Sequence, residues 1–185
     1  VVNASYFNKY IKIEGRENIE EALKQGKGLI FLAVHFGSWE LSNIICTKLG
    51  LTYKVLAREQ KRFAKLSQLL NNYRQSQGAV VVAKGIATRE IVKSLNKNEV
   101  VGMVADQGGK DGISVPFFGR DASIPTGAIR LALKLDAPVL IAFIVRKNGP
   151  YHKVIIKPQL KLTKTDNQEQ DILTNLKQVV RVAED

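Results

Sequence analysis

Short apolar runs recur along this chain, and they constrain its fold more than any other feature of the sequence. Most of them are too short for a surface helix and apolar throughout, which is typical of strands buried on both faces of a parallel sheet. We predict strands at residues 29–34, 53–57, 79–82, 100–105, 139–145 and 152–156.

Segments with one apolar face alternate with these runs. They predict helices at residues 15–25, 38–49, 61–77, 86–96, 125–135 and 167–182, with a glycine-rich loop at 106–119. Strands that alternate with amphipathic helices indicate an α/β fold, in which helices flank a mixed, largely parallel sheet. A length of 185 residues suits one domain, so we expect a single domain over residues 1–185.

The chain is strongly basic. It carries 28 Lys and Arg residues against 17 Asp and Glu residues, a formal net charge of +11. Such a surface attracts partners rich in phosphate or carboxylate, so nucleic acid, an anionic membrane and an acidic carrier protein all stay open. The chain has a single cysteine, Cys46, and two histidines, so we expect no disulfide and no structural metal.

The apolar runs are too short to cross a membrane. None approaches the roughly 20 apolar residues that a spanning helix needs, and residues 1–10 do not resemble a signal peptide. We therefore expect a soluble or peripheral chain. Because it begins at Val1 rather than at methionine and ends at Asp185 with no clear boundary, we also expect a fragment of a longer protein.

The motif His-Phe-Gly-Ser-Trp-Glu, residues 35–40, stands where the first buried strand passes into a helix. Open α/β sheets bind ligands at the carboxyl ends of their strands. We expect Ser38 to cap the helix, and its positive N-terminal end to keep the imidazole of His35 neutral. Glu40, in the first turn, would then approach the second ring nitrogen and support a general base. The alternative is that His35 and Glu40 are structural, and Gly37 only lets the chain turn.

His35 and Glu40, with four residues between them, resemble the signature histidine and acid of glycerolipid acyltransferases, and most of all the lipid A biosynthesis (late acyltransferase) branch. The resemblance runs from about residue 15 to residue 158. Further matching motifs are Gly26-Lys27-Gly28, Arg58, Asp106-Gln107, Phe117-Phe118-Gly119, Pro125-Thr126-Gly127 and Pro138.

The resemblance implies an enzyme of lipopolysaccharide biosynthesis. In such an enzyme His35, supported by Glu40, activates a hydroxyl of a lipid A precursor, which attacks an acyl thioester directly and needs no cofactor. Acyl carrier protein is favoured over coenzyme A as donor, because a basic surface steers an acidic carrier. The resemblance also implies the cytoplasmic face of the bacterial inner membrane, reached peripherally or through an N-terminal anchor absent from this chain, and a fuller C-terminal portion.

Further candidate site residues follow the other strands. Arg58 follows residues 53–57 and is expected to bind a substrate phosphate, unless it is an ordinary surface arginine. Asp106 and Gln107 follow residues 100–105 and are expected to position substrate, unless they only open a tight turn.

Residues 117–120 form the last candidate group. Phe117 and Phe118 suit an apolar groove for an acyl chain, although aromatic residues near strands often belong to the core. Gly119 completes the motif. Arg120 suits a lipid phosphate, although exposed arginines are common.

Alternatives stay open at the level of function. Another glycerolipid acyltransferase or a mannoside acyltransferase shares the same histidine and acid. A basic nucleic-acid-binding module would use the same charge, but the chain lacks a recognition helix or stacking motif, so no nucleic acid is expected.

The basic amphipathic segment 61–74 suits an anionic membrane, or it packs on the sheet through its apolar side. We interpret His152 as structural.

Overall fold

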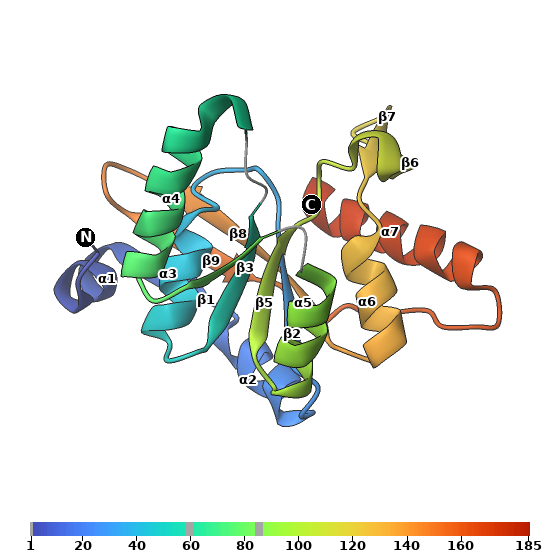
Figure 1. The fold of residues 1–185 in the computed structure, drawn as a ribbon, viewed down its shortest axis with the longest axis horizontal. Coiled ribbons are helices and arrows are strands. Elements are labelled where there is room, and N and C mark those ends of the chain that lie inside the picture. Colours follow the sequence, from blue (N-terminus) through green and yellow to red (C-terminus); the bar gives the residue numbers. More distant parts are fainter. Residues whose placement is uncertain (1, 58–60, 84–86) are drawn as a thin grey trace.

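The computed structural model describes residues 2–57, 61–83 and 87–185. Its centre is a seven-stranded sheet in the order β1-β9-β8-β2-β5-β3-β4 (Figure 1). Neighbouring strands are parallel except for β8 and β9, which run antiparallel. The strands are β1 (Ile11–Glu14), β2 (Leu29–Ala33), β3 (Tyr53–Ala57), β4 (Val80–Ala83), β5 (Val100–Val104), β8 (Val139–Arg146) and β9 (His152–Ile156).

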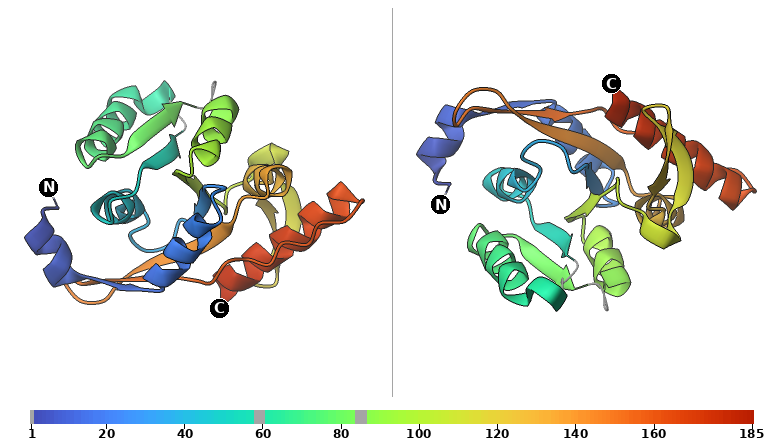
Figure 2. Two further views of the ribbon diagram at one scale, coloured as in Figure 1. Left: turned by 90° about the horizontal axis from the view of Figure 1, so that it is seen from below. Right: turned by 90° about the horizontal axis from the view of Figure 1, so that it is seen from above.

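Helices cover both faces of the sheet (Figure 2). Alternate residues of β2 point to opposite faces, so Leu29 and Phe31 join one apolar cluster while Ile30 and Leu32 join the other. The first cluster packs against α2 and α3, and the second against α5, α6 and α7. The helices are α1 (Ala4–Tyr10), α2 (Arg16–Lys24), α3 (Leu41–Lys48), α4 (Ala64–Ser76), α5 (Ala87–Asn96), α6 (Gly127–Leu135) and α7 (Gln168–Glu184).

The structure confirms the expected α/β fold with a mixed, mostly parallel sheet. Every predicted strand is present, with ends within a residue or two of those expected. The sequence did not predict α1, β1 or the two-stranded hairpin of β6 (Ile113–Phe117) and β7 (Arg120–Ile124). The hairpin was hidden because Pro116 and the neighbouring glycines disfavour a strand. It turns at Phe118 and Gly119, both at positive φ (49° and 72°), as a tight hairpin turn requires.

The helices of the described residues are all unsuited to crossing a bilayer, because none combines the necessary length with sufficient apolar character.

Candidate active site

Two neighbouring strands bring His35 and Asp106 together. Strands β2 and β5 are parallel, and Ala33 is in register with Val104 at their carboxyl ends. His35 and Asp106 each follow the end of their strand by two residues, so the sheet delivers both side chains to the same edge. The amide of Ala105 donates to the carbonyl of Ala33 at 2.9 Å and extends the pairing to the start of the site.

The Asp106 carboxylate holds His35 at two points. One oxygen lies 2.7 Å from Nδ1 of the ring, and the other accepts the backbone N–H of His35 at 2.8 Å. Trp39 packs its ring edge-on against the imidazole, with 4.9 Å between ring centroids. Nδ1 is therefore occupied, and Nε2 is the ring nitrogen left to exchange a proton with a substrate. The side chains of His35 and Asp106 are 33% and 20% exposed, so substrate can reach the pair.

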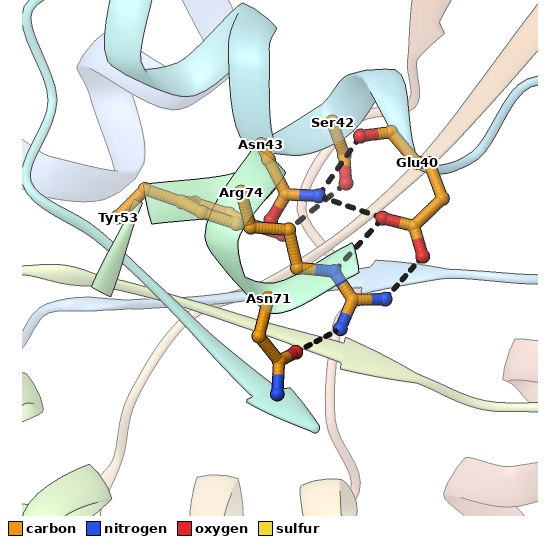
Figure 3. Close-up of polar contacts among 6 residues, drawn as sticks. All are labelled: Glu40, Ser42, Asn43, Tyr53, Asn71 and Arg74. Atoms are coloured by element: carbon orange, nitrogen blue, oxygen red, sulfur yellow. Dashed lines mark hydrogen bonds and ion pairs between the residues drawn. The ribbon is translucent and has the colours of Figure 1, made fainter. Parts of the chain in front are cut away.

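Glu40 belongs to a different cluster (Figure 3). Its carboxylate accepts two donors from the Arg74 guanidinium, one of them Nε at 3.0 Å, and a further bond from Asn43 Nδ2 at 3.2 Å. Asn71, on α4 like Arg74, accepts from the guanidinium at 2.9 Å. The Arg74 side chain is only 10% exposed. The ion pair therefore joins the start of α3 to the last turn of α4.

The expected start of the helix and the expected partner of the His35 ring are both wrong. Ser38 does not cap the helix, because α3 begins at Leu41, and it is Asp106 rather than Glu40 that binds the His35 ring. The cause is a tether to strand β8: Gly37 forms an isolated bridge with Ile144, whose carbonyl accepts the N–H of Ser38 at 2.9 Å. Residues held in this bridge to β8 cannot also enter the helix. The role of Glu40 stays a prediction.

The buried residues behind this cluster are neutral. Ser42 Oγ lies 3.3 Å from the Tyr53 hydroxyl (Figure 3), and both residues are buried. Burial raises the pKa of the Tyr53 phenol, and it likewise raises the pKa of the Cys46 thiol. Neither group can therefore serve as a base or a nucleophile at neutral pH.

Helix α4 is oriented differently from the expected packing. Its more polar side, which carries Asn71 and the buried Arg74, faces inward toward Glu40. Its large apolar residues are exposed, namely Leu66, Leu69, Leu70 and Tyr73, with Phe63 just before the helix. The interpretation that these apolar side chains pack on the sheet is therefore wrong. Arg74, the last cation of the basic segment 61–74, is buried and does not belong to a surface that could meet a membrane. The polar spacing of Ser67, Asn71 and Arg74 was the available signal.

The remaining candidates do not gather around His35. Arg58 lies outside the described residues. Gln107 is exposed next to Asp106, and the following loop is fixed to the hairpin by Gly108, whose N–H donates to the carbonyl of Ser123 at 2.9 Å.

The other four candidates lie on the β6–β7 hairpin. Phe117 packs against the core, whereas Phe118 is 67% exposed. Gly119 shares the turn with Phe118, and Arg120 is exposed at the start of β7. Among the described residues, none of the four shares a hydrogen bond or ring contact with His35. Instead, the N–H of Phe118 donates to Glu184 of α7 at 2.7 Å.

Known proteins resemble this chain along most of its length. The family model for bacterial lipid A biosynthesis acyltransferases matches residues 1–183. Phosphatidylinositol mannoside acyltransferase of Mycobacterium tuberculosis is 27% identical over 133 residues, which are 69% of this chain and 42% of the relative.

A second relative extends the match. Lipid A biosynthesis palmitoleoyltransferase of Escherichia coli is 23% identical over 169 residues, which are 89% of this chain and 54% of the relative. The chain thus spans about half the length of these relatives. Because the family model covers nearly all of it, the chain belongs to the bacterial lipid A biosynthesis acyltransferase family.

Proposed function

We propose that this chain carries the catalytic centre of an enzyme that transfers a fatty acyl group from a thioester to a hydroxyl of a membrane glycolipid, with a lipid A precursor as the favoured acceptor. The observation that carries the proposal is the bond between His35 Nδ1 and Asp106 at the carboxyl edge of the sheet. Two relatives whose names describe acyltransferases support it. The first of them acts on a mannoside by its name, so a mannoside is the alternative acceptor.

The geometry suits removal of a proton from an alcohol. With Nδ1 bonded to Asp106, the neutral His35 ring presents Nε2 as its basic nitrogen, and the carboxylate stabilises the imidazolium once it forms. The alcohol oxygen attacks the thioester carbonyl carbon as Nε2 takes its proton. The tetrahedral intermediate then breaks its carbon–sulfur bond, and the imidazolium returns the proton to the leaving thiolate. The products are an ester and a thiol, without a covalent acyl-enzyme or a cofactor.

Glu40 acts in this proposal by holding the catalytic loop. Its carboxylate faces Arg74 rather than the imidazole, so its support of His35 is indirect. The ion pair fixes the start of α3 against α4, and through it the end of the segment that contains His35. A positioned base is worth several orders of magnitude in rate, because small displacements of a reacting group are costly.

In this proposal the enzyme meets the membrane that holds its acceptor through a basic and partly apolar surface on α4, and its basic charge attracts the acyl donor. The exposed apolar side of α4 is accompanied by Arg62 and Lys65, both exposed, a combination suited to the interface of an anionic bilayer. We place the enzyme at the cytoplasmic face of the bacterial inner membrane, attached peripherally or through an anchor. The net charge of +11 favours an acidic carrier protein as donor, and coenzyme A, itself polyanionic, is the alternative.

The test uses the full-length enzyme in membranes with labelled acyl carrier protein or acyl-coenzyme A. Candidate lipid A precursors and mannosides are then analysed by mass spectrometry for the added acyl chain. His35→Ala should abolish transfer. Asp111→Asn alters an exposed acid in the loop that follows Asp106 and should leave transfer unchanged. Full turnover by His35→Ala would refute the proposed base, and acylation of mannosides alone would correct the acceptor.

A further inference from the structure

An open cavity of about 510 Å³ lies at the edge of the sheet formed by the starts of β1 and β9. Its walls come from the end of α1, from β1, and from the turn between β8 and β9. Its volume falls in the range of roughly 300–1,000 Å³ that is typical of small-ligand sites. The charged and aromatic residues that line it are Lys9, Tyr10, Lys12, Glu14, Lys147, Tyr151, His152 and Lys153.

The cavity carries an excess of positive charge. Of the described residues that line it, Glu14 alone carries a carboxylate, which lies 2.8 Å from the ammonium of Lys153 and 3.3 Å from that of Lys12. The bond to Lys153 in particular lowers the pKa of Glu14. Among the described residues, no carboxylate lies within ion-pair distance of Lys9 or Lys147. Four lysines against one carboxylate concentrate positive potential in this hollow, which raises the local concentration of anions.

Aromatic rings stand beside the lysines. The rings of Tyr10 and Tyr151 meet edge to face, with centroids 5.1 Å apart, and Tyr6 extends the row at 4.7 Å from Tyr10. Tyr151 is 49% exposed. A tyrosine presents an apolar ring face together with a polar hydroxyl, so the combination with lysines suits a ligand that has both a compact ring and a phosphate.

The cavity is connected to the catalytic loop. His152 lines the cavity, and its Nε2 lies 3.1 Å from the hydroxyl of Ser38, while its Nδ1 lies 2.9 Å from the carbonyl of Pro150. Only β8 separates β9 from β2, the strand that leads to His35. The wall formed by β9 is two strand spacings, roughly 10 Å, from β2, and the wall formed by β1 is three spacings, roughly 14 Å, a range that a phosphorylated headgroup of one or two sugars can span.

We propose that this cavity binds a phosphate group of the substrate, placed so that a sugar headgroup anchored there presents a hydroxyl to His35. The inference rests on the proposed function for its choice of a glycolipid substrate. Lys9 and Lys147 are the main contacts, because the other two lysines already face Glu14. The same chemistry would accept the phosphate of a pantetheine arm on the acyl donor, so acceptor and donor must be tested separately.

The first experiment measures binding without catalysis. Glucose 1-phosphate and glucose are titrated into the isotopically labelled full-length protein, with Kd taken from NMR shifts. We expect glucose 1-phosphate to bind and glucose not to bind. The double variant Lys9→Gln/Lys147→Gln should raise the Kd for glucose 1-phosphate about tenfold, because both lysines are exposed and contact the anion as point charges. The control Lys97→Gln/Lys177→Gln removes two exposed lysines elsewhere and should change nothing. Absence of phosphate binding, or equal binding by both double variants, would overturn the site.

The second experiment assigns the phosphate by steady-state kinetics. For an acceptor phosphate, Lys9→Gln/Lys147→Gln raises KM for the phosphorylated acceptor about tenfold, with kcat and the donor KM unchanged and no effect on a dephosphorylated acceptor. A rise confined to the donor KM assigns the site to the donor. Unchanged KM for both substrates refutes the inference. If lysine-dependent phosphate binding persists in a protein that transfers no acyl group, the proposed function fails and the site stands.

Discussion

At the scale of the residue, the chemistry available to the site depends on which carboxylate is hydrogen-bonded to His35. That carboxylate belongs to Asp106, which lies 71 positions away in the chain, and not to Glu40, which lies five positions away. Spacing within one motif can propose such a pair, whereas contacts across a sheet depend on strand order and register. Strands β2 and β5 are neighbours, and that adjacency is not encoded in either segment alone.

Asp106→Asn should lower kcat far more than it raises KM. The amide keeps the size of the side chain but can donate a hydrogen to Nδ1, which favours the tautomer that carries its proton on Nε2. We expect a loss of about 100- to 10,000-fold, comparable to losing a general base. Single-turnover measurement of acyl transfer separates this loss from binding. A variant with normal kcat and a raised KM would make Asp106 a substrate ligand instead.

Arg74 and Glu40 should show their coupling in the free energy of unfolding. Arg74→Met removes a nearly buried cation and leaves the Glu40 carboxylate without its main partner. We expect a loss of about 1–3 kcal/mol, toward the lower end because Glu40 is partly exposed.

The double variant Arg74→Met/Glu40→Gln should lose less than the sum of the two single variants. Urea unfolding of all four proteins gives the coupling energy directly. Simple additivity would mean that the ion pair contributes little and that each residue acts alone.

At the scale of the element, the segment between β2 and α3, which contains His35, is irregular and is held against β8. Gly37 has φ of 62° and bridges to Ile144, and a Cβ added there would collide with the Ile144 carbonyl oxygen. The glycine therefore lets the segment that contains His35 approach β8 closely. The sequence indicated a turn at Gly37, but the partner strand that makes glycine necessary appears only in the folded chain.

Gly37→Ala should disable the enzyme as well as destabilise it. Gly50→Ala is a matched control, because Gly50 also has positive φ (78°) but open space around the position of a Cβ. The control should cost only the conformational strain, on the order of 1 kcal/mol. Gly37→Ala adds a backbone collision next to His35, so it should lower both Tm and kcat further. Equal Tm and equal activity in the two variants would show that the approach to β8 is not required.

At the scale of the whole molecule, the strands and helices predicted from the sequence were largely found because buried strands and amphipathic helices leave strong periodic signals. The β6–β7 hairpin was not predicted because its turn and Pro116 resemble a loop. The burial of Arg74 was not predicted because helix α4 packs its polar side inward. An amphipathic pattern identifies two faces of a helix, but it does not say which face meets the protein. In α4 the apolar face is exposed, so it is available to contact a membrane.

Vesicle binding should therefore contain two separable contributions from α4. Exposed cations each gain on the order of 1 kcal/mol near an anionic surface, and this gain shrinks as the Debye length falls from about 30 Å at 0.01 M salt to about 8 Å at 0.15 M. Burial of Leu66 and Leu69 in the interface gains free energy in proportion to apolar area and is far less sensitive to salt. Cosedimentation with anionic vesicles across a salt series distinguishes the two.

Arg62→Glu/Lys65→Glu should bind at least tenfold more weakly than the wild type at low salt, and the two binding curves should converge as salt rises. Leu66→Ser/Leu69→Ser should instead lower binding at every salt concentration, because it removes the apolar contact and leaves the charges. Lys97→Glu/Lys177→Glu makes the same charge change away from α4 and should have a smaller effect at low salt. If the two α4 variants and this control bind alike, then α4 does not face the bilayer, and its exposed apolar residues must meet another surface.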